Sequence, residues 1–174
     1  MKKNIIITVL TILLFASNYL NFKRIAADAI SFLPPDMACS LSITFLQDAD
    51  EIVARNAADS LRILEVCEAD DPLLGAIDHY DANVRHNALN ALSCTGKSSI
   101  ALDSAIAILS DPCEEPFVIS SAISLIEKVQ DPGEKNKAIN ALKLFLNSDY
   151  EYNKVLTKDA IETLSGNKKK ENKI

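Results

Sequence analysis

A nine-residue pattern that occurs four times constrains the fold of this chain more than any other feature. The four windows align without gaps at residues 53–61 (VARNAADSL), 84–92 (VRHNALNAL), 118–126 (VISSAISLI) and 156–164 (LTKDAIETL). Position one is always Val or Leu, position five is always Ala, and position nine is Leu or Ile. These positions fall on one face of a helix. The pattern therefore predicts stacked helical repeats, none of which can bury its apolar face alone.

Helix-start signals and partner helices surround the windows. The residues that precede the windows as candidate N-caps are, in order, Asp48 or Asp50, Asp81, Asp111 with Pro112, and Ser148 or Asp149. Such side chains accept hydrogen bonds from the first N–H groups of a helix. Apolar residues at helical spacing predict partner helices at residues 37–47, 72–79, 98–109 and 134–147, the last behind an Asp131-Pro132 start. A chain with only four Gly does not suit an all-β sandwich, so an all-α fold is expected.

The N-terminus has the pattern of an export signal. Lys2 and Lys3 precede an apolar run at residues 5–16, which matches the basic and apolar regions of a secretory signal. The run is shorter than the roughly 20 residues that span a bilayer. Ala27-Asp28-Ala29 is a small-residue site, so we expect a signal peptide at residues 1–29 and cleavage after Ala29. The alternative is an uncleaved N-terminal anchor, and a buried N-terminal core helix is the less favoured interpretation.

One segment resembles a known family. Its residues are Asp81, Val84, Arg85, Ala88, Ala91, Leu92 and Gly96. The string resembles the second-helix signature of HEAT repeats, and the short bacterial type of the phycobilisome lyases is the most similar. The window that follows Asp50 resembles it with its Arg, Arg55, displaced by one position. The resemblance implies a short right-handed α-solenoid of about four HEAT-like helix–turn–helix repeats in residues 30–166. The lysine-rich residues 167–174 are expected to form a disordered basic tail.

The resemblance also implies a ladder of hydrogen bonds between a loop Asp and a helix Arg of stacked repeats. Asp81 and Arg85 are the counterparts in this sequence. Ile119 and Thr157 stand at the Arg position in the third and fourth repeats, so we expect the ladder to end early.

The sequence offers little for catalysis. The two histidines, His79 and His86, have no second ligand at metal-binding spacing, so no metal site is expected. Cys94 lies eight residues from His86, too far along a helix for a nucleophile and its base. Paired carboxylates at residues 70–71 and 114–115 lie at helix starts, where negative charge favours the helix dipole. There is no Gly-rich phosphate loop, and we predict no catalytic residue and no cofactor.

The four cysteines leave two alternatives open. In the repeat arrangement Cys39, Cys67 and Cys94 lie at one edge, which allows a bond between Cys39 and Cys67 or between Cys67 and Cys94. Cys113 lies at the opposite edge and is expected to be unpaired. The other alternative is that all four are small buried thiols.

A polar stripe is the candidate partner-binding surface. Positions three and seven of the windows point away from the Val/Ala/Leu face, toward the concave side where such arrays bind partners. These residues are Arg55, Asp59, His86, Asn90, Ser120, Ser124, Lys158 and Glu162. The stripe is polar in the middle and carries an opposite-charge pair at spacing i, i+4 at each end. The alternative is an ordinary solvated helix face.

Charge indicates the kind of partner. The whole chain has a net charge of -6, but residues 30–166 hold ten Lys and Arg against 22 Asp and Glu, a net of -12. This acidity excludes nucleic acid as a partner, and it favours a basic protein or peptide. We therefore expect an exported, non-catalytic interaction module, an adaptor or an immunity-like inhibitor, in the periplasm or secreted. Membrane contact is expected only through an uncleaved N-terminus. A HEAT-like lyase or chaperone-type enzyme is the alternative.

Overall fold

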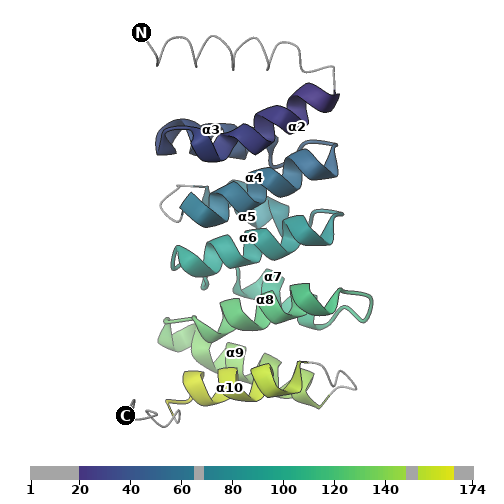
Figure 1. Cartoon of the computed structure of the whole chain (residues 1–174). Helices are drawn as coiled ribbons and strands as arrows, with labels where there is room; N and C mark the ends of the chain where they lie inside the picture. The colour runs from purple at the N-terminus through teal and green to yellow at the C-terminus, as the bar shows by residue number, and fades with distance from the viewer. Residues whose placement is uncertain (1–19, 65–68, 148–152, 167–174) are drawn as a thin grey trace, which may run out of the picture. The chain divides into compact units, whose positions relative to one another are not determined.

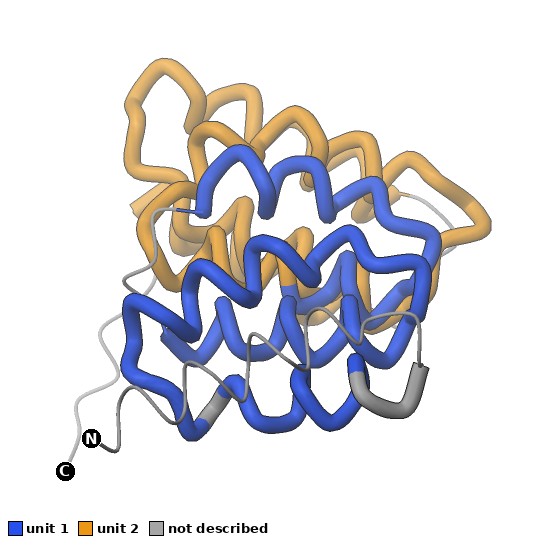
Figure 2. Tube along the Cα trace, turned by 90° about the horizontal axis from the view of Figure 1, so that it is seen from above, with its two compact units in different colours: residues 1–87 blue, residues 88–174 orange. Residues whose placement is uncertain are grey.

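The computed structural model describes residues 20–64, 69–147 and 153–166, and these ranges contain helices and turns but no strand. The chain divides into two compact units, Met1–Asn87 and Ala88–Ile174, coloured separately in Figure 2. The boundary falls inside helix α6 (Ala82–Cys94).

Unit 1 is built on α4. Its elements ahead of α6 are α2 (Leu20–Asp28), the 3-10 helix η1 (Ala29–Phe32), α3 (Pro35–Phe45), α4 (Glu51–Leu64) and α5 (Asp70–Ala76). Both α2 and α3 pack against α4, and η1 contacts all three of these helices. Figure 1 shows α2 and α4 running side by side. The core of this packing consists of Ala26, Ala27, Ile30, Ala38, Phe45, Val53 and Ala57.

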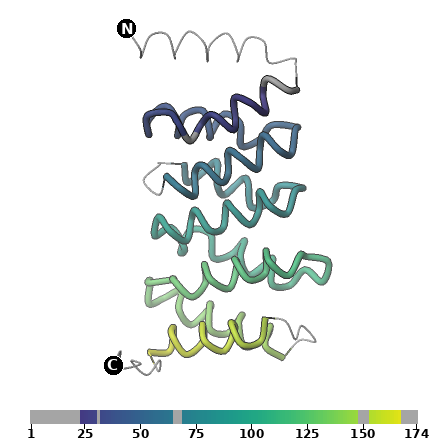
Figure 3. Tube along the Cα trace, in the orientation of Figure 1, coloured from purple at the N-terminus to yellow at the C-terminus, as the bar shows by residue number. Residues whose placement is uncertain are grey.

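Unit 2 is two helical hairpins. Its complete helices are α7 (Leu102–Leu109), α8 (Pro116–Glu127), α9 (Pro132–Leu146) and α10 (Lys154–Leu164). α7 pairs with α8 and α9 pairs with α10. α8 also contacts α10, and α7 contacts α9, so first helices form one layer and second helices another (Figure 3).

The alanine at position five explains how closely the helices approach. Ala57, Ala88, Ala122 and Ala160 are all 0% exposed. A methyl group lets a neighbouring backbone come near without a loss of helix propensity. The predicted inward face of the windows is therefore the packed face in both units.

The observed helix starts follow the predicted caps in part. The Asp50 and Asp81 carboxylates accept backbone N–H bonds from the first turns of α4 and α6, and Asp131 accepts from the N–H of Glu134 in α9. After the end of α6, Gly96 has a φ of 76°, a left-handed backbone conformation that residues other than glycine rarely adopt.

The predicted start of the third window is wrong. Asp111 accepts from the N–H of Cys113 and so closes a turn, while α8 begins at Pro116 with Glu115 in the cap position. The second proline, Pro116, has the fixed φ that suits the first helical position. The helix of the fourth window, α10, begins at Lys154 with Asn153 in the cap position. The expected caps Ser148 and Asp149 lie outside the described residues.

Packing begins earlier than the expected start of the domain at Ile30. α2 lies within the segment assigned to the leader, yet Ala26 and Ala27 belong to the core of unit 1. Residues 20–29 are thus an integral part of this fold, whereas cleavage after Ala29 stays a prediction. No helix in the described ranges is long and apolar enough to cross a membrane.

Candidate binding surface

Position three of the windows joins one repeat to the next. The Arg55 Nη2 atom donates to Asp81 Oδ2 at 2.8 Å, and the Asp81 carboxylate also accepts from the N–H groups of Asn83 and Val84. Burial raises the pKa of Asp81, but the Arg55 hydrogen bond and these N–H groups outweigh it and hold the pKa below its usual value. The charged form of Asp81 therefore stabilises both the start of α6 and its contact with α4.

The same contact occurs one repeat earlier. The Arg24 guanidinium of α2 reaches both oxygens of Asp50, with Nη2 to Oδ2 at 2.8 Å. The Arg24 hydrogen bond lowers the pKa of Asp50, and it outweighs the effect of burial. Asp50 in turn accepts from the N–H groups of Ile52 and Val53 at the start of α4.

The predicted counterpart Arg85 has a different set of acceptors. Its Nη1 atom donates to the backbone carbonyls of His79 and Tyr80, at 2.7 and 2.9 Å. Arg55, displaced by one position, supplies the ladder contact to Asp81.

Unit 2 contains an uncharged version of the ladder. Ser120, at position three of the third window, donates through Oγ to Asn153 Oδ1 at 2.8 Å. Asn153 lies in the cap position of α10, is 2% exposed, and donates back to the Pro116 carbonyl. A serine and an asparagine thus make here the contact that an arginine and an aspartate make in unit 1, whereas the early end of the Asp–Arg ladder stays a prediction.

These contacts change the interpretation of the polar stripe. Arg55 and Ser120 hold the following helix start, so they are not free to line a groove. The expected pair between Arg55 and Asp59 is absent, and Asp59 instead accepts from Arg62 at 2.7 Å. His86, Asn90 and Ser124 are partly exposed, while Lys158 and Glu162 are exposed. Partner binding by the stripe stays a prediction.

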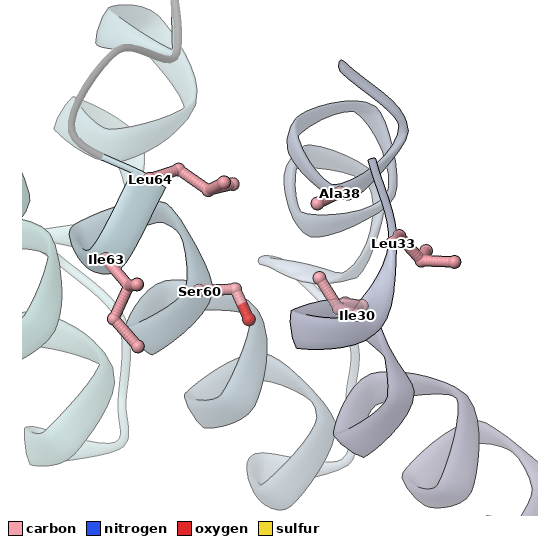
Figure 4. A pocket seen from close by; sticks show the side chains of 6 residues that line it. All are labelled: Ile30, Leu33, Ala38, Ser60, Ile63 and Leu64. Carbon is pink, nitrogen blue, oxygen red and sulfur yellow. The ribbon is translucent and has the colours of Figure 1, made fainter. Parts of the chain in front are cut away.

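Unit 1 has an apolar hollow that the sequence did not predict. It has a volume of about 80 Å³ and is lined by Ile30, Leu33, Ala38, Ser60, Ile63 and Leu64 (Figure 4). Figure 4 shows the Leu64 side chain extending from α4 toward Ala38. Ile63 is 60% exposed at this site. The only sequence signal was the apolar pair at residues 63–64, which continues beyond the end of the first window.

The chemistry of the hollow suits binding. Its lining is aliphatic apart from the Ser60 hydroxyl, which donates to the Asn56 carbonyl. No group of three or more His, Cys, Asp or Glu in the described ranges could hold a metal ion. His79 lies outside the hollow. It stacks on Tyr80 and accepts from the N–H of Asp81 through Nδ1, and burial lowers its pKa.

The cysteines separate into two kinds. Cys39 in α3 is disulfide-bonded, whereas Cys94 and Cys113 are exposed free thiols. The alternative of four buried thiols is therefore wrong, and so is a bond between Cys67 and Cys94. Cys67 itself lies outside the described residues.

Comparison with known proteins identifies the fold. No family model matches the chain, and no curated protein matches it. The structure is similar to a designed armadillo repeat protein, YIII(Dq)4CqI, with a TM-score of 0.66 and 20% identity over 84% of this chain and 77% of that one. The fold is therefore an α-solenoid of helical repeats, as predicted. The assignment to HEAT repeats in particular stays a prediction.

Proposed function

We propose that this protein is a non-catalytic scaffold that binds a segment of another protein outside the cytoplasm. The observation that carries the proposal is the open apolar hollow of unit 1, lined by three helical elements of a repeat fold. A hollow of about 80 Å³ is well below the ~300 Å³ at which small-molecule pockets begin. It suits a single aliphatic side chain of a partner, which would contact the exposed Ile63.

Charge defines the rest of the partner. Residues 20–87 hold five Lys and Arg against twelve Asp and Glu, a net of -7. A net negative charge accelerates association with basic partners and slows association with acidic ones. We therefore propose a basic protein or peptide that inserts one apolar side chain. An adaptor and an immunity-like inhibitor both fit this description.

Export is supported by two independent features. The first is the basic and apolar N-terminal pattern at residues 2–16. The second is the disulfide of Cys39, because disulfides persist mainly in oxidising compartments. Together they favour a periplasmic or secreted protein.

The lyase or chaperone-type enzyme is less well supported. Such an enzyme needs convergent polar groups in a pocket. The hollow of unit 1 includes none of the polar residues His86, Asn90, Ser120 and Ser124 that were candidates for such a site. Its aliphatic lining favours binding over acid–base chemistry.

A pair of matched variants tests the proposal. Ile63→Asp places a charge in the hollow, while Leu144→Asp makes the same change at an exposed position of α9 in unit 2. Immobilised wild-type protein and each variant are incubated with envelope extract at low salt. We expect a basic protein to be retained by the wild type and by Leu144→Asp, but not by Ile63→Asp, and to elute as the salt is raised. Equal retention by all three proteins would exclude the hollow as the binding site.

A further inference from the structure

The helix α2 repeats the pattern of the four windows. Residues 22–30 (FKRIAADAI) lie 31 positions ahead of residues 53–61 (VARNAADSL), the same period that separates the first and second windows. The two segments are identical at positions three, five, six and seven. The matching pairs are Arg24 and Arg55, Ala26 and Ala57, Ala27 and Ala58, and Asp28 and Asp59.

The contacts of α2 repeat as well. Arg24 pairs with Asp50 at 2.8 Å across 26 positions, and Arg55 pairs with Asp81 at 2.8 Å across the same 26 positions. Lys23 of α2 adds a second ion pair, to Asp48 at 2.9 Å. α2 therefore matches the second helices of the windows in sequence, and its ion pair with Asp50 matches the ion pair that Arg55 of α4 makes with Asp81.

A cut after Ala29 would disrupt this packing. It would remove Ala26 and Ala27, which are 3% and 2% exposed in the core. It would also place a charged α-amino group on Ile30, which is 0% exposed. The side chain of Asp50, 9% exposed, would lose its arginine. Each change leaves a buried group unpaired or a buried surface open.

We propose that a leader peptidase cleaves this chain between Ala16 and Leu20, and that α2 remains as the N-terminal repeat helix of the mature protein. The proposal rests on the export component of the proposed function and not on partner binding. In the reaction, water adds across one peptide bond, which leaves a carboxylate on the leader and an amine on the mature chain. The small residues Ala16 and Ser17 lie at the end of the apolar run at residues 5–16, and the cleavage site of a secretory signal follows such a run.

The test is the intact mass of the protein recovered from the extracytoplasmic fraction of bacterial cells that express the full chain. We expect a mass that places the first residue between Ser17 and Leu20. A first residue of Ile30 would overturn the proposal, because α2 would be part of the leader. A mass that retains Met1 would overturn the cleavage, and recovery only inside the cells would overturn export. None of these readings depends on a partner.

A second measurement uses substitutions within α2. In the exported mature protein we expect Arg24→Ala to lower the melting temperature, because Asp50 loses its partner. Ile25→Ala is the matched control, since Ile25 is exposed, and it should melt like the wild type. If Arg24→Ala does not fold, Arg24→Lys retains the charge and allows the same comparison. Identical masses and melting temperatures for wild type and both Arg24 variants would show that α2 has been removed.

Discussion

At the scale of single residues, Asp81 has two structural roles. It caps α6 through two backbone N–H groups, and it receives Arg55 from α4. We expect Asp81→Ala to lower the free energy of unfolding by at least the ~1 kcal/mol of a lost N-cap, because Arg55 also loses its partner. Thermal unfolding measures the effect. Asp78→Ala, an exposed change three residues earlier, is the control and should shift the melting temperature little. Equal effects of the two changes would contradict this role of Asp81.

The pH dependence of stability provides a second prediction at this scale. Burial lowers the pKa of His79 in the folded protein below its ordinary value of 6.5. The unfolded chain then binds the proton more readily, so the neutral ring stabilises the fold above pH 6.5, and this contribution is lost as pH falls through the folded pKa. Protonation also removes the acceptor for the N–H of Asp81.

We therefore expect the melting temperature to fall between pH 7 and pH 5, and to fall less in His79→Gln. The control is His86→Gln, at the only other histidine of the chain, which should keep the slope of the wild type. If the pH dependence disappears in His86→Gln and persists in His79→Gln, the effect belongs to His86 and this prediction is wrong.

At the scale of helices, α8 and α9 provide a matched pair of starts. Both begin with proline, but Asp131 caps α9 through the N–H of Glu134, whereas Glu115 ahead of α8 makes no side-chain cap bond. We expect Asp131→Ala to lower the free energy of unfolding by about 1 kcal/mol. Glu115→Ala should cost clearly less. Chemical denaturation of the two variants measures the difference, and equal losses would mean that the Asp131 cap contributes nothing.

The helices also show how far sequence reasoning reached. The four windows predicted α4, α6, α8 and α10, because a buried Ala at position five and apolar ends determine one packed face. The segment of α2 has the same pattern. It was not predicted as a repeat helix, because the apolar run ahead of it led us to assign residues 1–29 to a signal peptide. Local signals also misplaced the start of α8, since Asp111 and Pro112 suit a turn as well as a helix start.

For the molecule as a whole, the candidate site was less predictable than the fold. Position three points away from the apolar face, which suggested a groove, but only the contacts between repeats reveal that Arg55 and Ser120 are already engaged. The hollow depends on residues of η1, α3 and α4 that are distant in sequence. No single window contains a signal for such a site.

The disulfide connects the fold to the compartment of the whole protein. Cys39 is disulfide-bonded, whereas Cys94 and Cys113 are free thiols. We expect two of the four thiols of the unfolded, unreduced protein to react with a thiol reagent, and four after reduction. Reduction should lower the free energy of unfolding by about 2–4 kcal/mol, because the unfolded chain regains the conformational freedom that the bond removes.

Two cysteine variants provide the comparison. Cys39→Ser should show this loss of stability without reductant, whereas Cys113→Ser, at an exposed free thiol, should behave like the wild type. Four reactive thiols in unreduced protein purified from an oxidising compartment would contradict this prediction. The disulfide would then be absent in the compartment to which export delivers the chain, and it would no longer support export.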